Sequence, residues 1–169
     1  MCHETVAVGY SDPMPRHADI SLLFDFFVTG QRVRRVLADA LEGSGMRPDE
    51  YAVYSLLLEQ GPLTATEMAE LLGMPLSTVL DYLKEMTRAG HLVRTSHPFD
   101  GRAVQVSLNR AGLAAQRRAN AHWEIVRRRI EENLTMPAGR IRKALRALDD
   151  SAGLAAHRLR TERARAARA

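Results

Sequence analysis

The sequence predicts a mainly α-helical protein with one small β-hairpin. Ala, Leu and Arg dominate the 169 residues, and aromatic residues make up only 5%, a mix that favours helices over sheets. Apolar residues recur at helical spacing on both sides of the middle of the chain. Between them, residues 92–108 hold two short runs of alternating polarity around a turn, which is typical of a hairpin.

The N-terminal third is expected to contain a loose arm and two helices. Residues 1–18 carry glycine and proline without a sustained period and are interpreted as the arm. Helical spacing starts at Asp19 and continues through Ala40, until the Glu-Gly-Ser-Gly sequence of residues 42–45 ends it. A second helix begins at Pro48, because proline suits the first helical position, and stops at Gly61.

Two shorter helices joined by a tight turn follow a short extended segment, residues 63–64. Thr64 and Glu67 form a capping-box pattern for a helix over residues 65–72, which the following glycine ends. After a Met-Pro turn, the next helix is expected over residues 76–89. The residues expected to point inward from these two helices are Met68, Leu71, Leu72, Val79, Tyr82, Leu83 and Met86.

A hairpin and long helices complete the chain. Strands are expected over residues 92–95 and 104–108, because a Pro-Phe-Asp-Gly turn separates them. Asn109 can cap a long helix over residues 110–134. A last helix is expected over residues 138–148, with a break at a Ser-Ala-Gly sequence before it resumes.

This order of elements predicts a winged helix-turn-helix flanked by long helices. Two short helices with a tight turn, followed by a hairpin, are its signature. In this motif the first short helix supports the second, and the second enters the major groove of DNA. The hairpin, or wing, reaches a neighbouring minor groove. The flanking helices are strongly apolar on one face and are therefore expected to need a partner.

The middle of the chain, residues 46–112, resembles the MarR family of bacterial regulators. The matching stretches are GPLTATEMAELLG (61–73), Ser77-Thr78-Val79, residues 86–90, Asp100-Gly101-Arg102 and VSLNRAG (106–112). The first stretch looks like the family's short strand and supporting helix. The next two look like its DNA-recognition helix and the end of that helix. The last two look like its wing and the start of the helix that follows. The resemblance implies a homodimer whose two wings straddle a pseudo-palindromic operator, with the flanking helices as the dimer layer.

The resemblance also implies a division of the chain and a function. The parts would be a flexible arm (1–18), a dimerisation helix (19–45), the winged DNA-binding domain (46–109) and C-terminal dimerisation helices (110–169). The expected function is a DNA-binding transcriptional regulator, a repressor that a small aromatic or phenolic effector releases. The alternative is a helical interaction or scaffold protein, a degenerate relative that does not read DNA.

Nine residues are candidates for DNA contact: Ser77, Thr78, Leu80, Asp81, Lys84, Arg88, Arg94, Asp100 and Arg102. At the wing tip, Arg102 would enter a narrow minor groove, with a solvated hairpin arginine as the alternative. Asp100 is expected to shape the wing by pairing with an arginine. Ser77 and Thr78 would meet phosphates or base edges, with helix capping as the alternative.

The charge of the chain is unevenly distributed. Residues 1–109 hold nine Lys/Arg and fourteen Asp/Glu, whereas residues 110–169 hold fifteen and six. Residues 46–109 carry five and eight, a net charge of −3, which weakens the expectation of strongly salt-dependent binding by this segment alone. The Arg127–Arg129 run and the Arg-rich tail are interpreted as solvated helix faces, with contact to flanking DNA as the alternative.

The outward face of the expected recognition helix is unusual. Leu76, Leu80 and Asp81 stand where the family usually has polar or basic residues. A leucine can meet thymine methyl groups, whereas an aspartate repels phosphates unless it accepts a hydrogen bond from cytosine or pairs with an arginine. Lys84, Arg88, Arg94 and the basic helices would then supply the phosphate contacts.

A small-molecule pocket is the second candidate site. In the related family, a cleft between the dimer layer and the DNA-binding lobe binds small aromatic effectors. Its candidate lining residues here are Phe24, Phe27, Tyr51, Tyr54, His122 and Trp123, with ordinary core packing as the alternative.

Other classes of protein and site are not indicated. The sequence lacks a phosphate loop, a nucleophile elbow and paired catalytic carboxylates, so neither an enzyme nor a cofactor is expected. No two histidines stand at helical i, i+4 spacing, and Cys2-His3-Glu4 with His17 is only a weak metal cluster. Redox sensing by Cys2 is not favoured, because no basic residue is near. With neither a signal peptide nor a membrane span, a cytoplasmic protein is expected.

Overall fold

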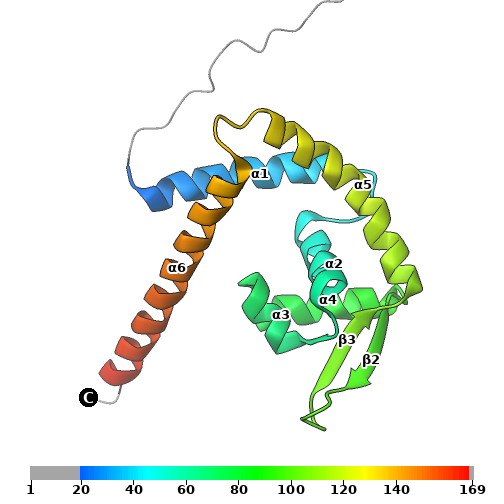
Figure 1. Cartoon of the computed structure of the whole chain (residues 1–169). Helices are drawn as coiled ribbons and strands as arrows, with labels where there is room; N and C mark the ends of the chain where they lie inside the picture. Colours follow the sequence, from blue (N-terminus) through cyan, green and yellow to red (C-terminus); the bar gives the residue numbers. More distant parts are fainter. Residues whose placement is uncertain (1–19, 168–169) are drawn as a thin grey trace, which may run out of the picture.

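The computed structural model describes residues 20–167. Its elements in chain order are α1 (Leu22–Leu41), α2 (Pro48–Gln60), β1 (Leu63–Thr64), α3 (Ala65–Leu72), α4 (Leu76–Arg88), β2 (Leu92–Ser96), β3 (Val104–Leu108), α5 (Arg110–Glu132) and α6 (Ala138–Ala166). In Figure 1, α2, α3 and α4 are grouped with the β2–β3 hairpin, and α1 crosses above this group. α5 rises along one edge and α6 descends on the opposite side. The predicted fold class is confirmed.

The core joins the winged segment to α1 and α5. Most of its buried side chains come from α2, α3, α4 and β3, but α1 contributes Leu41 and α5 contributes Ala115 and Ala119. The fully buried residues include Val53, Tyr54, Met68, Val79 and Met86. Burying an aliphatic side chain of this size contributes about 1.5–3 kcal/mol, so this shared core fixes α5 against α2.

The sheet has three antiparallel strands in the order β1-β3-β2. In the hairpin, Leu92 lies opposite Leu108 and Ser96 opposite Val104, so β2 extends one residue beyond its predicted end. β1 adds a third strand, with Leu63 opposite Val106. The start of α3 is thereby tied to the base of the wing.

The predicted caps explain where several helices begin and end. Thr64 accepts a hydrogen bond from the Glu67 N–H at 3.2 Å, and the Glu67 carboxylate accepts from the Thr64 N–H at 2.7 Å. Gly73 ends α3 in the left-handed conformation, with φ at 61°. Asn109 accepts from the Gly112 N–H at 3.0 Å and begins α5. α1 begins at Leu22 with Ser21 as its cap, three residues after the predicted start.

Two sequence expectations are wrong. α6 is continuous, whereas a break was expected near Gly153. One glycine costs a helix only about 1 kcal/mol, and Ser151 bonds back to the Ala147 carbonyl at 2.8 Å instead of leaving the helix. Leu71 was expected to point inward but is 53% exposed, since Met68 and the half-buried Leu72 already occupy the inner face of α3.

The long helices expose apolar side chains. On α1 they are Leu22, Leu23, Phe26, Phe27, Val33 and Val36; on α5, Ile125 and Ile130; on α6, Leu145, Leu154 and Leu159. α1 packs against α5 and α2, while no other element in residues 20–167 packs extensively on α6. No helix in this part of the chain is both long and apolar enough to span a membrane.

Candidate nucleic-acid interface

The inner face of α4 anchors the helix, which leaves its outer face exposed. Val79, Leu83 and Met86 are buried in the core, whereas Leu76 and Leu80 are about half exposed at 43% and 49%. Four further outward positions carry exposed charged residues: Asp81, Lys84, Glu85 and Arg88. These four charges cancel, so the helix presents apolar and polar groups rather than a net positive field.

The first turn of α4 leaves two hydroxyl groups without partners. Pro75 occupies the N-cap position, and no side chain caps this end of the helix. Neither Ser77 nor Thr78 makes a side-chain hydrogen bond within residues 20–167, so helix capping does not account for them. Both hydroxyl groups are therefore available to form hydrogen bonds with a bound molecule.

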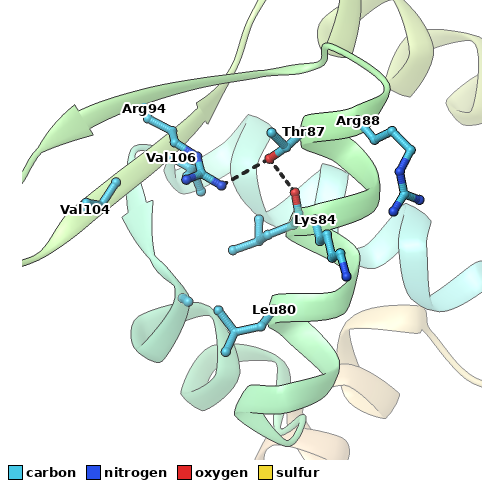
Figure 2. A pocket seen from close by; sticks show the side chains of 9 residues that line it. Leu80, Lys84, Thr87, Arg88, Arg94, Val104 and Val106 are labelled. Carbon is cyan, nitrogen blue, oxygen red and sulfur yellow. Dashed lines mark hydrogen bonds between the residues drawn. The ribbon is translucent and has the colours of Figure 1, made fainter.

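A hollow of about 470 Å³ lies between α4 and the wing, which Figure 2 shows from close by. It is lined by Ala65, Leu80, Leu83, Lys84, Thr87, Arg88, Arg94, Val104 and Val106. Arg94 reaches from β2 toward α4, where its guanidinium donates to the Thr87 hydroxyl at 3.3 Å. Thr87 in turn donates to the Leu83 carbonyl at 2.7 Å. This short chain of bonds holds Arg94 over the hollow.

A second hollow, of about 360 Å³, lies on the other side of α4. Its lining residues are Arg47, Thr78, Asp81, Tyr82, Lys84, Glu85 and Arg88. Because Lys84 and Arg88 line both hollows, they form the ridge between them. The hollows therefore bring together six of the candidate residues, Thr78, Leu80, Asp81, Lys84, Arg88 and Arg94, whereas Ser77, Asp100 and Arg102 line neither hollow.

Arg47 is a residue of this surface that the sequence did not single out. It pairs with the Glu85 carboxylate at 2.9 Å, and its guanidinium lies 5.4 Å from the centre of the Tyr82 ring. Glu85 is thereby compensated, but Asp81 makes no ion pair in the described part of the chain. Arg47 and Glu85 are 38 residues apart, so no local pattern could have indicated their contact.

The wing tip is held by hydrogen bonds from its backbone N–H groups to its own side chains. The Asp100 carboxylate accepts from the Arg102 N–H at 3.0 Å, and His97 Nδ1 accepts from the N–H groups of Phe99 and Asp100 at 3.2 and 3.1 Å. Asp100 thus bonds the backbone of an arginine, not the expected guanidinium. The exposed Arg102 guanidinium has no partner in residues 20–167. Phe99, which the sequence did not single out, is 93% exposed beside it.

The six candidate pocket residues fall into two groups. Tyr51, Tyr54 and Trp123 belong to the core: Tyr51 stacks on Trp123 with ring centres 4.4 Å apart, and the Tyr54 hydroxyl shares a 2.7 Å hydrogen bond with His91. Phe24, Phe27 and His122 lie outside that core, and Phe27 and His122 are exposed. Core packing accounts for the first group.

The remaining candidates from the sequence are a metal cluster and a redox-sensing cysteine. Cys2, His3, Glu4 and His17 lie outside the described residues. Within residues 20–167, no three His, Cys, Asp or Glu side chains are grouped closely enough to hold a metal ion.

Comparisons with known proteins bear on this architecture. The family model described as sugar-specific transcriptional regulator TrmB matches residues 41–100. No curated protein matches the chain. Among solved structures, the M. tuberculosis transcriptional regulator MosR in complex with DNA is 19% identical, with a TM-score of 0.68, over 80% of this chain and 98% of MosR.

Two further structures share the fold. CouR from Rhodococcus jostii RHA1, bound to p-coumaroyl-CoA, is 22% identical with a TM-score of 0.69, over 82% of this chain and 96% of CouR. MarR from E. coli, in its apo form, is 20% identical with a TM-score of 0.62, over 78% of this chain and 97% of MarR.

The winged fold and the family model define a winged-helix transcriptional regulator. The long helices on both sides of the winged segment also match the fold of MosR, CouR and MarR. The resemblance predicted from the sequence is thereby confirmed. Proteins of this class are regulators and not enzymes.

Proposed function

We propose that the protein is a homodimeric repressor that binds a pseudo-palindromic DNA operator through α4 and the wing. The observation that carries the proposal is the exposed outer face of α4 with a hollow on each side of it, together with the unpaired arginine of the wing tip. Lys84, Arg88 and Arg94 surround the outer face of α4, and Arg102 projects without a partner. Basic groups around an exposed helix match what major-groove binding requires.

Each candidate residue has a role in this proposal. Ser77 and Thr78 donate from free hydroxyls to phosphates or base edges, and Leu80 meets thymine methyl groups. Lys84, Arg88 and Arg94 contact phosphates, and Arg102 enters the minor groove. The Asp81 carboxylate repels phosphates and so lowers affinity for most DNA sequences. Asp100 fixes the backbone of the wing tip.

The dimer is proposed from the exposed apolar faces of the long helices. Phe26, Phe27 and Leu23 of α1 are each more than half exposed, as are Leu154 and Leu159 of α6. A single chain would leave these faces in water, whereas a second copy would bury them. Two copies also place two winged segments side by side, as a two-fold symmetric operator requires.

Release by a small aromatic effector is the regulatory part of the proposal. CouR holds p-coumaroyl-CoA, and the present chain has a mostly apolar hollow of about 420 Å³ between α1 and α5, lined by Val36, Val126, Arg129, Ile130, Asn133 and Leu134. A ligand can release DNA only if it binds the released arrangement more tightly than the DNA-bound one. If phenolic acids bind the cytoplasmic dimer but leave operator affinity unchanged, this part is wrong.

The rival function is a helical scaffold that does not read DNA. The net charge of −3 over residues 46–109 and the unpaired Asp81 favour it. Selection of bound fragments from the source genome separates the two functions. A regulator enriches one or a few promoter fragments, and Arg102→Ala weakens their binding while the control Arg142→Ala on α6 does not. No enrichment above bulk DNA would favour the scaffold.

A further inference from the structure

The direction of α6 places its far end on the same side as the DNA-binding surface. α5 has 23 residues and α6 has 29, so at 1.5 Å per residue they extend about 35 and 44 Å. α5 leads away from the wing, and Figure 1 shows α6 returning on the opposite side to the level of α3 and the hairpin. Because α6 is longer than α5, it is long enough to return to the level at which α5 begins.

The last turns of α6 carry four arginines without partners. Arg158, Arg160, Arg163 and Arg165 are exposed, and none of them makes an ion pair within residues 20–167. On α5, by contrast, Arg127 is held between Glu124 and Glu131 at 2.7 and 2.6 Å. The helix dipole favours cations only in the last turn, so it accounts for Arg163 and Arg165 but not for Arg158 and Arg160.

An apolar stripe on α6 is the surface of this helix that a second copy would cover. Its members alternate at spacings of four and three residues: Ile141, Leu145, Leu148, Ala152, Ala155 and Leu159. This stripe stops at Leu159, whereas three of the four arginines follow it: Arg160, Arg163 and Arg165. Burying the stripe in a dimer would therefore hold α6 in place and leave its basic end in solvent.

The winged segment lacks the positive charge that its function requires. Residues 46–109 have a net charge of −3, and on α4 Asp81 and Glu85 offset Lys84 and Arg88. DNA affinity depends on the number of phosphates that Lys and Arg neutralise. Residues 110–169, with fifteen Lys/Arg against six Asp/Glu, hold the surplus.

We infer that the C-terminal end of α6 binds the phosphate backbone of the same DNA that α4 and the wing occupy. This inference rests on the proposed function, and it assigns Arg158, Arg160, Arg163 and Arg165 as sequence-independent phosphate contacts. They compensate for the charge that the winged segment lacks. Base selection stays with α4 and the wing, whereas α6 supplies affinity and salt dependence.

The test compares two quadruple variants of the full-length protein. In the distal variant Arg158, Arg160, Arg163 and Arg165 are replaced by Gln. In the proximal control Arg140, Arg142, Lys143 and Arg146 are replaced by Gln. Both remove four positive charges from the same helix, and Gln keeps a good helix propensity. Circular dichroism and sedimentation check helix content and assembly, and fluorescence anisotropy measures binding to a selected genomic fragment as salt is varied.

The distal variant is expected to bind the fragment at least about tenfold more weakly at physiological salt. The slope of log affinity against log salt should become shallower by up to about 7, at about 0.9 per lost phosphate contact and four arginines in each of two copies. The proximal control should change affinity less than about twofold, and the preferred sequence should stay the same in both variants.

Three results would overturn the inference. In one, both quadruple variants lose affinity equally, which indicates a general effect of charge. In the second, the distal variant binds DNA as the wild type does but no longer binds vesicles of phosphatidylserine, which assigns the arginines to a membrane surface. In the third, the wild type selects no genomic fragment at all, and then the proposed function fails together with the inference.

Discussion

Gly112 is the residue at which a single methyl group should disturb the joint between the wing and α5. It is buried in the first turn of α5, where its N–H donates to Asn109 at 3.0 Å. A Cβ at this position would fall well inside contact distance of the His91 carbonyl oxygen and 3.1 Å from a Leu108 methyl. That carbonyl already accepts from the Asn109 N–H at 3.0 Å, so it cannot move without losing the bond.

The expected cost of Gly112→Ala follows from these contacts. Overpacking a filled site costs about 1–3 kcal/mol, and a strained hydrogen bond adds about 0.5–1.5 kcal/mol. The gain in helix propensity returns at most about 1 kcal/mol. The free energy of unfolding should therefore fall by about 2 kcal/mol, which corresponds to a Tm lower by about 4–8 °C for a chain of this size.

Thermal unfolding followed by circular dichroism at fixed protein concentration measures this effect. Gly153→Ala is the matched control, because it lies inside α6 and a Cβ there would meet nothing within 4 Å. The control should raise the free energy of unfolding by about 0.5–1 kcal/mol through helix propensity alone. If Gly112→Ala is as stable as the wild type, the close approach of α5 to His91 is not present in solution.

Three further outcomes are expected. Burial, with a smaller effect of Glu50, raises the pKa of Tyr54 to about 12, so the folded chain keeps a proton that the unfolded chain loses near pH 10. The free energy of unfolding should then fall between pH 10 and 12, by up to roughly 2 kcal/mol, and denaturant titrations of Tyr54→Phe should lack this component. Asp81→Asn should raise affinity for non-operator DNA by about threefold in anisotropy titrations, whereas unchanged affinity would remove the repulsive role of Asp81. Arg102→Ala should weaken operator binding by at least about tenfold. Asp100→Ala should weaken it by about threefold, because only the hydrogen bond that supports the backbone of the wing tip is lost. Equal losses in the two variants would contradict these separate roles of Arg102 and Asp100.

Local signals in the sequence predicted most helix and strand boundaries correctly. A cap needs only neighbouring residues, so the Thr64–Glu67 pair, the glycine after α3 and Asn109 each identified a helix end. The alternation around the hairpin likewise indicated β2 and β3, although the burial of the strands does not alternate: Leu92 alone is partly buried in β2, and Val106 is the buried residue of β3. These features depend on residues less than five positions apart.

Features that depend on distant residues were not predicted. The pairing of β1 with β3 and the Arg47–Glu85 contact join residues about forty positions apart. The break expected at Gly153 is absent because surrounding helix formers outweigh one glycine. The aromatic residues proposed as a pocket could not be separated by sequence into buried Tyr51 and exposed Phe27, since both recur at helical spacing.

For the candidate site, the sequence indicated which residues lie at the surface but not how they are held. Arg94 and Arg102 were identified from their places in the hairpin, yet the Thr87 bond that holds one and the free guanidinium of the other depend on side-chain positions. The roles of all nine candidates in DNA contact stay predictions.

The most direct test of the central claim is hydroxyl-radical footprinting of a selected genomic fragment by the wild type and by Arg102→Ala. A winged dimer predicts two symmetric protected half-sites, about one helical turn or a multiple of it apart, each with an outer minor-groove segment that the wing covers. Arg102→Ala should lose protection of the outer segments while the inner protection by α4 remains. A single unsymmetric footprint, or outer protection that persists in Arg102→Ala, would contradict the proposal that two wings and two α4 helices read the operator.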